Sequence, residues 1–218
     1  MNRALMARGD VYRGAWAEAL VALNESFFAT AGGSAAAPAT GAYHVFSTNS
    51  GDVANPLFDA APRALVAVPS FLTEAQRRPD GSVDLRASSK ALVTTVTVTT
   101  QSVSSNVKII AYGSSTASVP IIKNEELILL QTEANNALGN RAAAIQDLDF
   151  IRVNSGGLAP LGAAYAGDLV DEILYNRRHS LFDEYGHRWV DLRRYGRLAT
   201  LEKALPTHKM TAVRAGAA

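Results

Sequence analysis

Residues 176–196 of the chain read NRRHSLFDEYGHRWVDLRRYG. These 21 residues include five arginines, three acids, four aromatic residues and two glycines, with apolar positions between them. So many aromatic residues are not expected in a helix that is exposed to solvent, and so many charges are not expected in an apolar core. The stretch therefore predicts a short helix, a break at Gly186, and a second helix whose arginines are held against carboxylates.

A second distinctive block lies upstream, where residues 120–134 read PIIKNEELILLQTEA. In this order and at this spacing, the two blocks resemble the C-terminal part of SusD/RagB-family proteins, the glycan-capturing lipoproteins of bacterial outer membranes. The family signature is an Arg-rich helix, then Glu-Gly-His-Arg-Trp, an apolar residue, Asp-Leu-Arg-Arg, an aromatic residue and Gly. The matching positions are Arg177, Arg178, Leu181, Glu184, Gly186, His187, Arg188, Trp189, Asp191, Leu192, Arg193, Arg194 and Gly196.

The chain also departs from the family pattern. Tyr185 is inserted between the Glu and the Gly of the signature. Asn176 and Ser180 stand where many relatives carry Glu, so two ion pairs common in the family are expected to be missing. Lys123 occupies a position where Arg is frequent. The resemblance covers about half of the chain well and the remainder only loosely.

The resemblance implies a mainly α fold, in which tetratricopeptide-like helical hairpins carry an inserted loop-rich subdomain with a small β-hairpin. It implies non-catalytic binding of an oligosaccharide or similar polymeric nutrient at the bacterial cell surface, without a cofactor, for delivery to a TonB-dependent outer-membrane transporter. Family members are anchored through a lipidated N-terminal Cys, and this chain has no cysteine. We therefore expect a surface-exposed outer-membrane location through an anchor absent from this chain, and interpret the chain as a fragment.

The composition excludes several other classes of function. The 218 residues are 48% hydrophobic, enough for a sizeable core, and their formal net charge is +1. So small a charge does not steer a protein to nucleic acid or to anionic lipid. The lack of cysteine excludes disulfides, thiolate catalysis and Cys-based zinc sites. No run of about 18 apolar residues is present, and the first ten residues do not form a signal peptide.

Residues 1–28 predict a helical hairpin, with two apolar stripes separated by a break at Gly14. Residues 118–152 follow the same plan, with a break at Gly139. Small residues flank both turns because closely crossing helices leave no room for side chains, as in tetratricopeptide repeats. The matched pairs, all 125 positions apart, are Gly14 with Gly139, Ala19 with Ala144, Leu20 with Ile145, and Leu23 with Leu148.

These segments predict a single, incomplete SusD-like domain over residues 1–218. The first hairpin would occupy residues 1–28, an inserted subdomain would occupy 29–117, and the second hairpin with the signature helices would occupy 118–200.

Within the insert, residues 92–100 alternate with period two and are β-branched nearly throughout, which predicts a strand. Residues 107–112 are its expected partner, so a small hairpin and not a full sheet is predicted. Residues 42–46 predict a further short strand. Downstream, residues 168–184 predict a helix with Asp168 as its N-cap.

The signature could be a ligand site, because Arg and Trp stack on sugars and Arg pairs with carboxylates. We favour a structural clamp. Asp191 would pair with Arg188 or Arg194, three residues away, and Glu184 would neutralise nearby arginines. A buried Trp189, together with Leu192, would supply most of the anchoring, because exposed ion pairs contribute little. The proposed clamp residues are Arg177, Arg178, Glu184, Gly186, Arg188, Trp189, Asp191 and Arg193.

No pattern of catalytic or metal-binding residues stands out. The four histidines lack the spacing of known metal motifs, so no metal site is predicted. Glu126 and Glu133 share one helix face, whereas a glycosidase needs two carboxyls facing each other across a cleft. We therefore predict a binding protein and not an enzyme. A helical-repeat module that binds a protein, with no sugar contact, remains the alternative.

Sugar binding needs aromatic faces for apolar CH patches and polar side chains for hydroxyls. The insert offers Tyr43, Phe46 and Tyr112 as candidate ligand-binding residues. Packing in a core or on a strand is the competing explanation for each of these aromatic residues.

Overall fold

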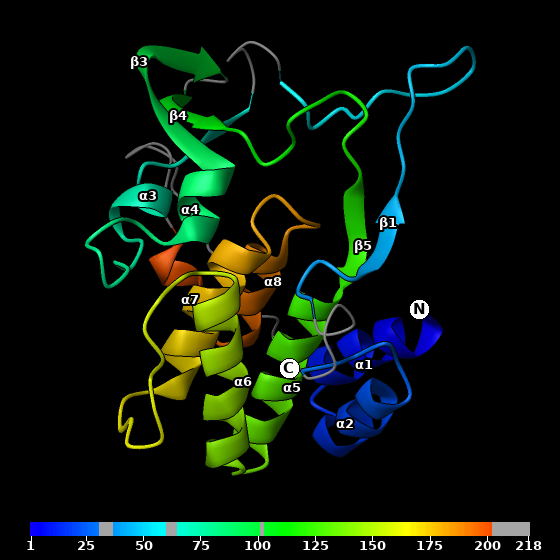
Figure 1. The fold of residues 1–218 in the computed structure, drawn as a ribbon, viewed down its shortest axis with the longest axis vertical. Coiled ribbons are helices and arrows are strands. Elements are labelled where there is room, and N and C mark those ends of the chain that lie inside the picture. The colour runs from blue at the N-terminus through cyan, green and yellow to red at the C-terminus, as the bar shows by residue number, and fades with distance from the viewer. Residues whose placement is uncertain (31–36, 60–64, 101–102, 202–218) are drawn as a thin grey trace, which may run out of the picture.

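The computed structural model describes residues 1–30, 37–59, 65–100 and 103–201. Among these residues, six longer helices gather in the lower half of Figure 1: α1 (Asn2–Tyr12), α2 (Trp16–Asn24), α5 (Asn124–Ala137), α6 (Arg141–Asn154), α7 (Leu169–Ser180) and α8 (His187–Arg194). Above them lie α3 (Ser70–Thr73), α4 (Leu85–Lys90), β1 (Gly41–His44), β2 (Val66–Ala67), β3 (Ala91–Thr100), β4 (Val103–Ile109) and β5 (Val119–Lys123). A 3-10 turn, η2 (Leu198–Thr200), follows α8. None of the helices in the described ranges has the length and apolarity needed to cross a membrane.

The predicted repeat is confirmed at the level of backbone hydrogen bonds. Gly14 and Gly139 adopt left-handed φ values of 79° and 80°. The next residue donates its N–H to the carbonyl five positions back in both turns, from Ala15 to Asp10 and from Asn140 to Asn135, each at 2.8 Å. This is the Schellman ending of a helix, and it favours glycine because the left-handed region penalises a Cβ. The two hairpins therefore share one turn design.

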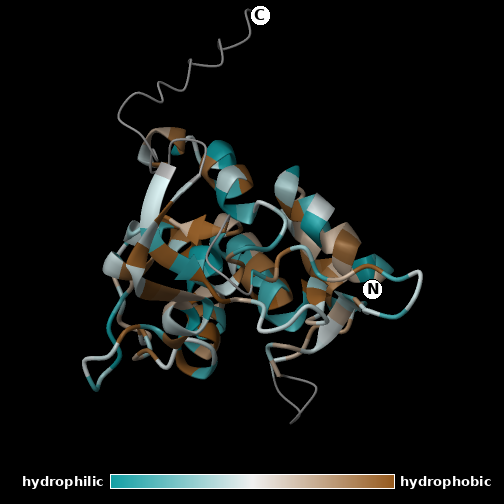
Figure 2. Cartoon of the chain, turned by 90° about the horizontal axis from the view of Figure 1, so that it is seen from above, coloured by the Kyte–Doolittle hydropathy of each residue, from teal (hydrophilic) through white to brown (hydrophobic). Residues whose placement is uncertain are grey.

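α5 lies at the centre of the helical half, between α1 and α2 on one side and α6 and α7 on the other (Figure 1). Its Leu127 and Leu130 pack with Ala4, Ala7 and Leu23 of the first hairpin. Each helix carries both hydrophobic and hydrophilic residues (Figure 2), as elements that bury one face do. α5 differs by burying a second apolar surface, which makes it the core of the bundle. That second surface comprises Ile128 and Leu129, packed with Ala144, Ile145, Leu148, Ile151, Leu169 and Ile173.

The strands form two separate antiparallel groups. β3 pairs with a strand that follows it, as predicted, from Ala91 opposite Ile109 to Thr100 opposite Val103, with an irregularity between Val93 and Val98. That partner, β4, begins at Val103 and ends at Ile109, earlier at both ends than the predicted 107–112. β2 adds a third strand on the other side of β4, so the sheet is larger than the predicted hairpin. The second group is a ribbon of β1 and β5.

Two further expected boundaries are wrong. Residues 119–123 form β5 instead of the start of a helix, so the second hairpin begins only at Asn124. β1 lies against β5 so closely that a Cβ on Gly41 would fall 2.4 Å from the Ile122 carbonyl oxygen. Because residues 119–123 pair with β1, they form a strand, and the helix begins only after them.

α7 begins at the predicted N-cap, where the Asp168 carboxylate accepts a hydrogen bond from the Val170 N–H at 2.8 Å. The helix ends at Ser180, four residues earlier than expected. Three left-handed residues, Asp183, Tyr185 and Gly186, then turn the chain into α8. The break predicted at Gly186 is present, but it begins before that residue.

Candidate functional site

The two signature helices are clamped to the bundle by buried ion pairs. Arg177 of α7 is fully buried, and its Nε donates to the Asp191 carboxylate of α8 at 2.7 Å. Arg194 of α8 donates to Glu133 of α5, and to the Val11 carbonyl of α1 at 3.0 Å. The consecutive helices α7 and α8 therefore meet the distant helices α1 and α5 in one charged cluster.

The structure changes three details of the predicted clamp. Asp191 pairs mainly with Arg177, 14 residues away, and its contact with Arg194 is longer at 3.8 Å. Glu184 contacts lysines and not arginines, with Lys123 at 2.7 Å and Lys90 at 3.8 Å. Both differences arise because the folded chain brings charges from other elements closer than those on the same helix.

The third correction concerns Trp189, which is 47% exposed instead of buried. Its indole lies against the Arg193 guanidinium, 5.2 Å from the ring centroid, on the outer face of α8. Leu192 is the buried apolar anchor, at 1% exposure. Burial of one leucine contributes about 1.5–3 kcal/mol. The charged cluster also holds α8 in place, because separating its members would leave buried charges without partners.

A cavity of about 540 Å³, here called the tyrosine cavity, opens between α4 and the β1–β5 ribbon. Tyr43 of β1 and Tyr112, which follows β4, both line it. The Tyr43 hydroxyl donates to the Ala39 carbonyl, and the Tyr112 hydroxyl donates to the Asp183 carbonyl at 3.2 Å. These hydrogen bonds fix both rings in place.

Phe46 is not among the residues that line the tyrosine cavity. Its ring packs edge-on against His44, with 4.6 Å between centroids. The fold thus brings together two of the three predicted ligand-binding residues and leaves the third outside.

The inner end of the tyrosine cavity is charged. The Lys123 ammonium contacts Glu184 at 2.7 Å and Glu125 at 3.2 Å, and it donates to the Ser180 carbonyl at 3.0 Å. Lys90 donates to the same carbonyl at 2.5 Å and keeps 17% of its side chain exposed. The two lysines and two glutamates balance in charge, so the site suits a neutral polar ligand.

Burial and the neighbouring charges shift the pKa values of this cluster in different directions. Burial, together with the nearby Lys123, lowers the pKa of Lys90 to about 8. Burial also raises the pKa of Glu184. It would raise that of Glu125 as well, but Lys123 and Lys90 outweigh burial and lower the pKa. Lys123 lies between the two carboxylates, so its own pKa is raised despite burial.

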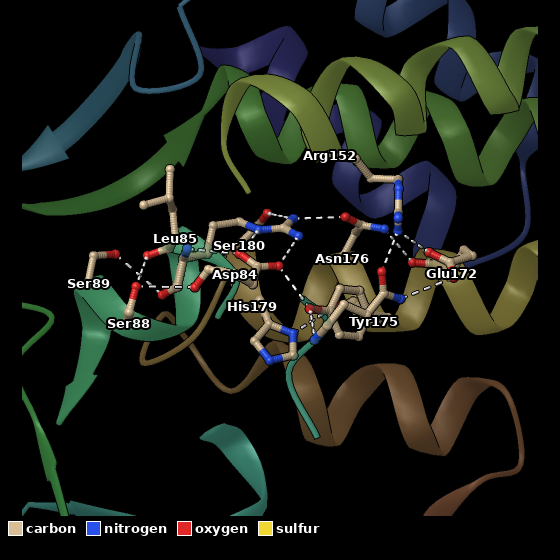
Figure 3. A network of polar contacts seen from close by, with 12 residues as sticks. Asp84, Leu85, Ser88, Ser89, Arg152, Glu172, Tyr175, Asn176, His179 and Ser180 are labelled. Carbon is tan, nitrogen blue, oxygen red and sulfur yellow. Dashed lines mark hydrogen bonds and ion pairs between the residues drawn. The ribbon is translucent and has the colours of Figure 1, made fainter. Parts of the chain in front are cut away.

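α4, which forms one wall of the cavity, is held against α7 by a second polar network (Figure 3). Arg86 pairs with Asp84 at 2.6 Å and donates to the Asn176 side chain at 2.8 Å and to the Ser180 hydroxyl at 3.1 Å. Tyr175 donates to Asp84 at 2.9 Å. Asn176 and Ser180 accept hydrogen bonds from an arginine whose charge Asp84 already balances.

Several residues that line the tyrosine cavity could not be identified from the sequence. Ser88 and Ser89 of α4 line the cavity, and so does Ser155 at the end of α6. Ser155 has a buried hydroxyl without a hydrogen-bond partner among the described residues. These serines lie in no motif or periodic pattern, so only the assembled fold identifies them.

Glu126 and Glu133, the two carboxylates considered as candidate catalytic groups, are both paired with arginines. Arg8 contacts both oxygens of Glu126, at 2.6 and 2.7 Å, and Arg194 contacts Glu133. His179 and His187 are separate from each other, hydrogen-bonded to backbone carbonyls and to the Tyr12 hydroxyl respectively. Within the described ranges, no group of three or more His, Asp or Glu side chains could hold a metal ion.

The fold is similar to that of several solved SusD-superfamily structures. A protein from Bacteroides vulgatus ATCC 8482 gives a TM-score of 0.62 at 16% identity, with 93% of this chain and 53% of that chain covered. B. fragilis NanU gives 0.54 at 16% identity, with 88% and 55% covered. A protein from Bacteroides thetaiotaomicron VPI-5482 gives 0.50 at 18% identity, with 93% and 50% covered. The chain thus spans about half the length of these proteins, and the likeness at such identities concerns the fold.

No protein of curated function matches the chain in sequence. The sequence profile of the SusD family matches residues 80–215, more than half of the chain, and includes both α4 and the signature helices. The buried clamp, the paired hairpins and this match agree. The chain belongs to the SusD family.

Proposed function

We propose that this chain binds an oligosaccharide or similar polymeric nutrient in the tyrosine cavity and does not cleave it. Membership of the SusD family suggests a glycan- or nutrient-binding surface protein, and proteins of this family are generally non-catalytic. The observation that carries the proposal is that Tyr43 and Tyr112, which are distant in sequence, line one cavity.

The shape and chemistry of the cavity suit a sugar. Its volume of about 540 Å³ falls within the usual range for small-ligand sites. Tyrosine rings cover the apolar faces of a pyranose. The hydroxyls of Ser88 and Ser89 donate to backbone carbonyls at the start of α4 at 3.3–3.4 Å and can still accept hydrogen bonds from a sugar. The unpartnered Ser155 hydroxyl supplies a further hydrogen bond that the described residues leave unused.

The charged end of the cavity supports binding without bond cleavage. A glycosidase needs one carboxyl group to protonate the leaving oxygen and a second to act on the sugar. Glu125 and Glu184 instead share Lys123, at 3.2 and 2.7 Å. Both carboxylates are therefore committed to an ammonium group and support the cavity wall.

Substitution of the two tyrosines tests the site. Tyr43→Ala and Tyr112→Ala should each weaken glycan binding by about tenfold, since loss of a stacking ring costs about 1.4 kcal/mol or more. Phe46→Ala is the matched control because Phe46 lies outside the cavity. Affinity electrophoresis against a panel of polysaccharides, followed by calorimetry, measures the effect. Equal loss in all three variants, or loss only with Phe46→Ala, would place the site elsewhere.

We further propose that the protein acts at the outer-membrane surface and passes its ligand to a TonB-dependent transporter. The family assignment supports this proposal, since SusD-family proteins generally associate with outer-membrane transporters. Affinity purification from detergent-solubilised outer membranes should recover a TonB-dependent barrel with the protein. Recovery of no such barrel under conditions that keep the protein folded would count against the partnership.

A further inference from the structure

A second cavity, of about 480 Å³, lies beside the turn between α7 and α8. We call it the loop cavity. Residues 181–188 form much of its wall, and α3 contributes Ser70 and Phe71. Glu184 lines both cavities, but neither Tyr43 nor Tyr112 reaches this one. It therefore needs an explanation separate from the proposed sugar site.

One wall of the loop cavity is flat and apolar. The rings of Phe71 and Phe182 stack with 3.9 Å between centroids, and Leu181 and Val68 lie beside them. Phe71 is itself 1% exposed and packs against His179 from α7. This wall is a rigid surface that fits the body of an aromatic or branched aliphatic ligand.

Three arginines line the same cavity, and only two are neutralised. Arg177 is paired with Asp191, and Arg178 is paired with Glu74 at 2.6 Å and donates to Ser70 at 2.7 Å. Arg188 makes no hydrogen bond and no ion pair with any residue in the described ranges. Burial and the neighbouring Arg178 lower its pKa, and the Asp191 and Glu74 carboxylates, which lie beyond ion-pair distance, offset this only in part. A half-buried guanidinium in this position would be stabilised by an anion.

The turn also presents a hydrogen-bond acceptor that the fold does not use. Asp183 adopts a left-handed φ of 61°, and its Oδ2 is buried with no partner among the described residues. Burial raises the pKa of its carboxyl group to about 6. Tyr185, two residues on, is left-handed as well, with φ of 46°. Such strained non-glycine residues cluster at functional sites, because the surrounding structure must hold them in place.

From these features we propose that the loop cavity binds a small amphipathic carboxylate. The carboxylate group would lie on Arg188, a hydroxyl or ammonium donor would meet Asp183, and the apolar body would pack on Phe182, which Phe71 supports from behind. The ligand therefore needs one carboxylate for Arg188 and one hydrogen-bond donor for Asp183. The apolar wall excludes a fully hydroxylated sugar, which would leave its polar groups unpaired there.

The test uses 3-phenyllactate as the probe, because it combines a phenyl ring, one hydroxyl and one carboxylate. Ligand-observed NMR and titration of the full chain should show saturable binding. The neutral amide of the same acid should bind at least tenfold more weakly, because it cannot pair with Arg188. Absence of saturable binding, or equal affinity for acid and amide, would overturn the proposal.

Two variants locate the binding. Arg188→Gln should abolish the preference for the acid, and the fold should persist because the Arg188 head group has no partner to lose. Arg193→Gln is the matched control, since it removes the same charge from the outer face of α8. Asp183→Gly removes the acceptor and suits the left-handed φ of 61°, so it should remove the preference for 3-phenyllactate over 3-phenylpropionate, which lacks the hydroxyl. An unchanged acid preference in Arg188→Gln, or an equal loss in Arg193→Gln, would contradict the site.

Discussion

At the scale of single residues, burial and partner decide what each charged side chain does. Arg177 and Arg188 belong to the same signature and both line the loop cavity. Arg177 is fully buried against Asp191, whereas Arg188 is half-buried without an ion pair in the described ranges. The first holds the fold together, and the second is available to a ligand.

Substitution of Arg177 tests this division. Arg177→Met should lower the free energy of unfolding by about 3–5 kcal/mol, because Asp191 is left buried without its main partner. Trp189→Ala is the control and should cost less than about 1 kcal/mol, since the indole is largely exposed. Urea denaturation followed by circular dichroism measures both. If Trp189→Ala lowered the free energy of unfolding more than Arg177→Met did, Trp189 would be the main anchor of α8, as the sequence predicts.

At the scale of elements, the helical hairpins are formed by local rules. Both turns end their helix with a left-handed glycine followed by a hydrogen bond reaching five residues back. Small residues, Ala19 and Ala144, are fully buried where the helices cross. Local sequence does not determine the boundaries of β5 and α7. Pairing with β1 determines the extent of β5, and the left-handed turn at residues 183–186 follows the end of α7.

Two glycines of the first hairpin give opposite predictions for the same substitution. Gly14→Ala should destabilise the chain by about 1 kcal/mol, because its φ of 79° is unfavourable for a residue with a Cβ. Gly9→Ala lies within α1, with open space around the added methyl, and should stabilise by about 0.5–1 kcal/mol. Thermal unfolding of the two variants should shift in opposite directions. A Gly14→Ala variant that unfolds at or above the wild-type temperature would show that the turn does not constrain the hairpin.

At the scale of the whole molecule, α5 joins both hairpins while α7 joins the bundle to the insert. Arg8 links the first hairpin to Glu126 of α5, and Arg86 links α4 to α7. His187 lies inside this network, with Nδ1 at 2.9 Å from the Tyr12 hydroxyl. The folding equilibrium therefore depends on the protonation of groups that only the assembled chain buries.

The buried histidines predict an acid-sensitive fold. Burial lowers the pKa of His179 to about 4 and, with Arg177 and Arg8, lowers that of His187 to about 3. Below about pH 6.5, the ordinary pKa of histidine, these two side chains bind protons in the unfolded chain but stay neutral in the folded chain. Each should therefore reduce stability by up to about 1.4 kcal/mol per pH unit as the pH falls from 6.5 to 4.

The histidines should be titrated directly and not inferred from stability at different pH values. Asp147 and Asp183 stabilise the folded chain as the pH falls, which opposes the effect of the histidines on stability. Burial raises the pKa of both carboxyls to about 6, so the native chain binds protons there that the unfolded chain does not. NMR of the ring nitrogens should show His179 and His187 neutral at pH 5 in the folded protein. Protonation of either ring near pH 6.5 would contradict the buried network.

The sequence by itself determined the features that depend on neighbouring residues. Gly14, Gly139 and Asp168 specify turns and a cap because φ and short-range hydrogen bonds are local, and alternation over residues 92–100 specifies a strand. The two spaced blocks were also sufficient to indicate the family, because they preserve the order of residues that the clamp needs.

Only the tertiary structure decided which side chains meet. It paired Asp191 with Arg177, exposed Trp189, and placed Tyr43 beside Tyr112 while leaving Phe46 outside. Ion pairs and cavities depend on distances across the folded chain, and spacing along one helix does not measure those distances. α4 and the β1–β5 ribbon line the tyrosine cavity, whereas α3 and the turn between α7 and α8 line the loop cavity, so each cavity depends on elements far apart in the chain.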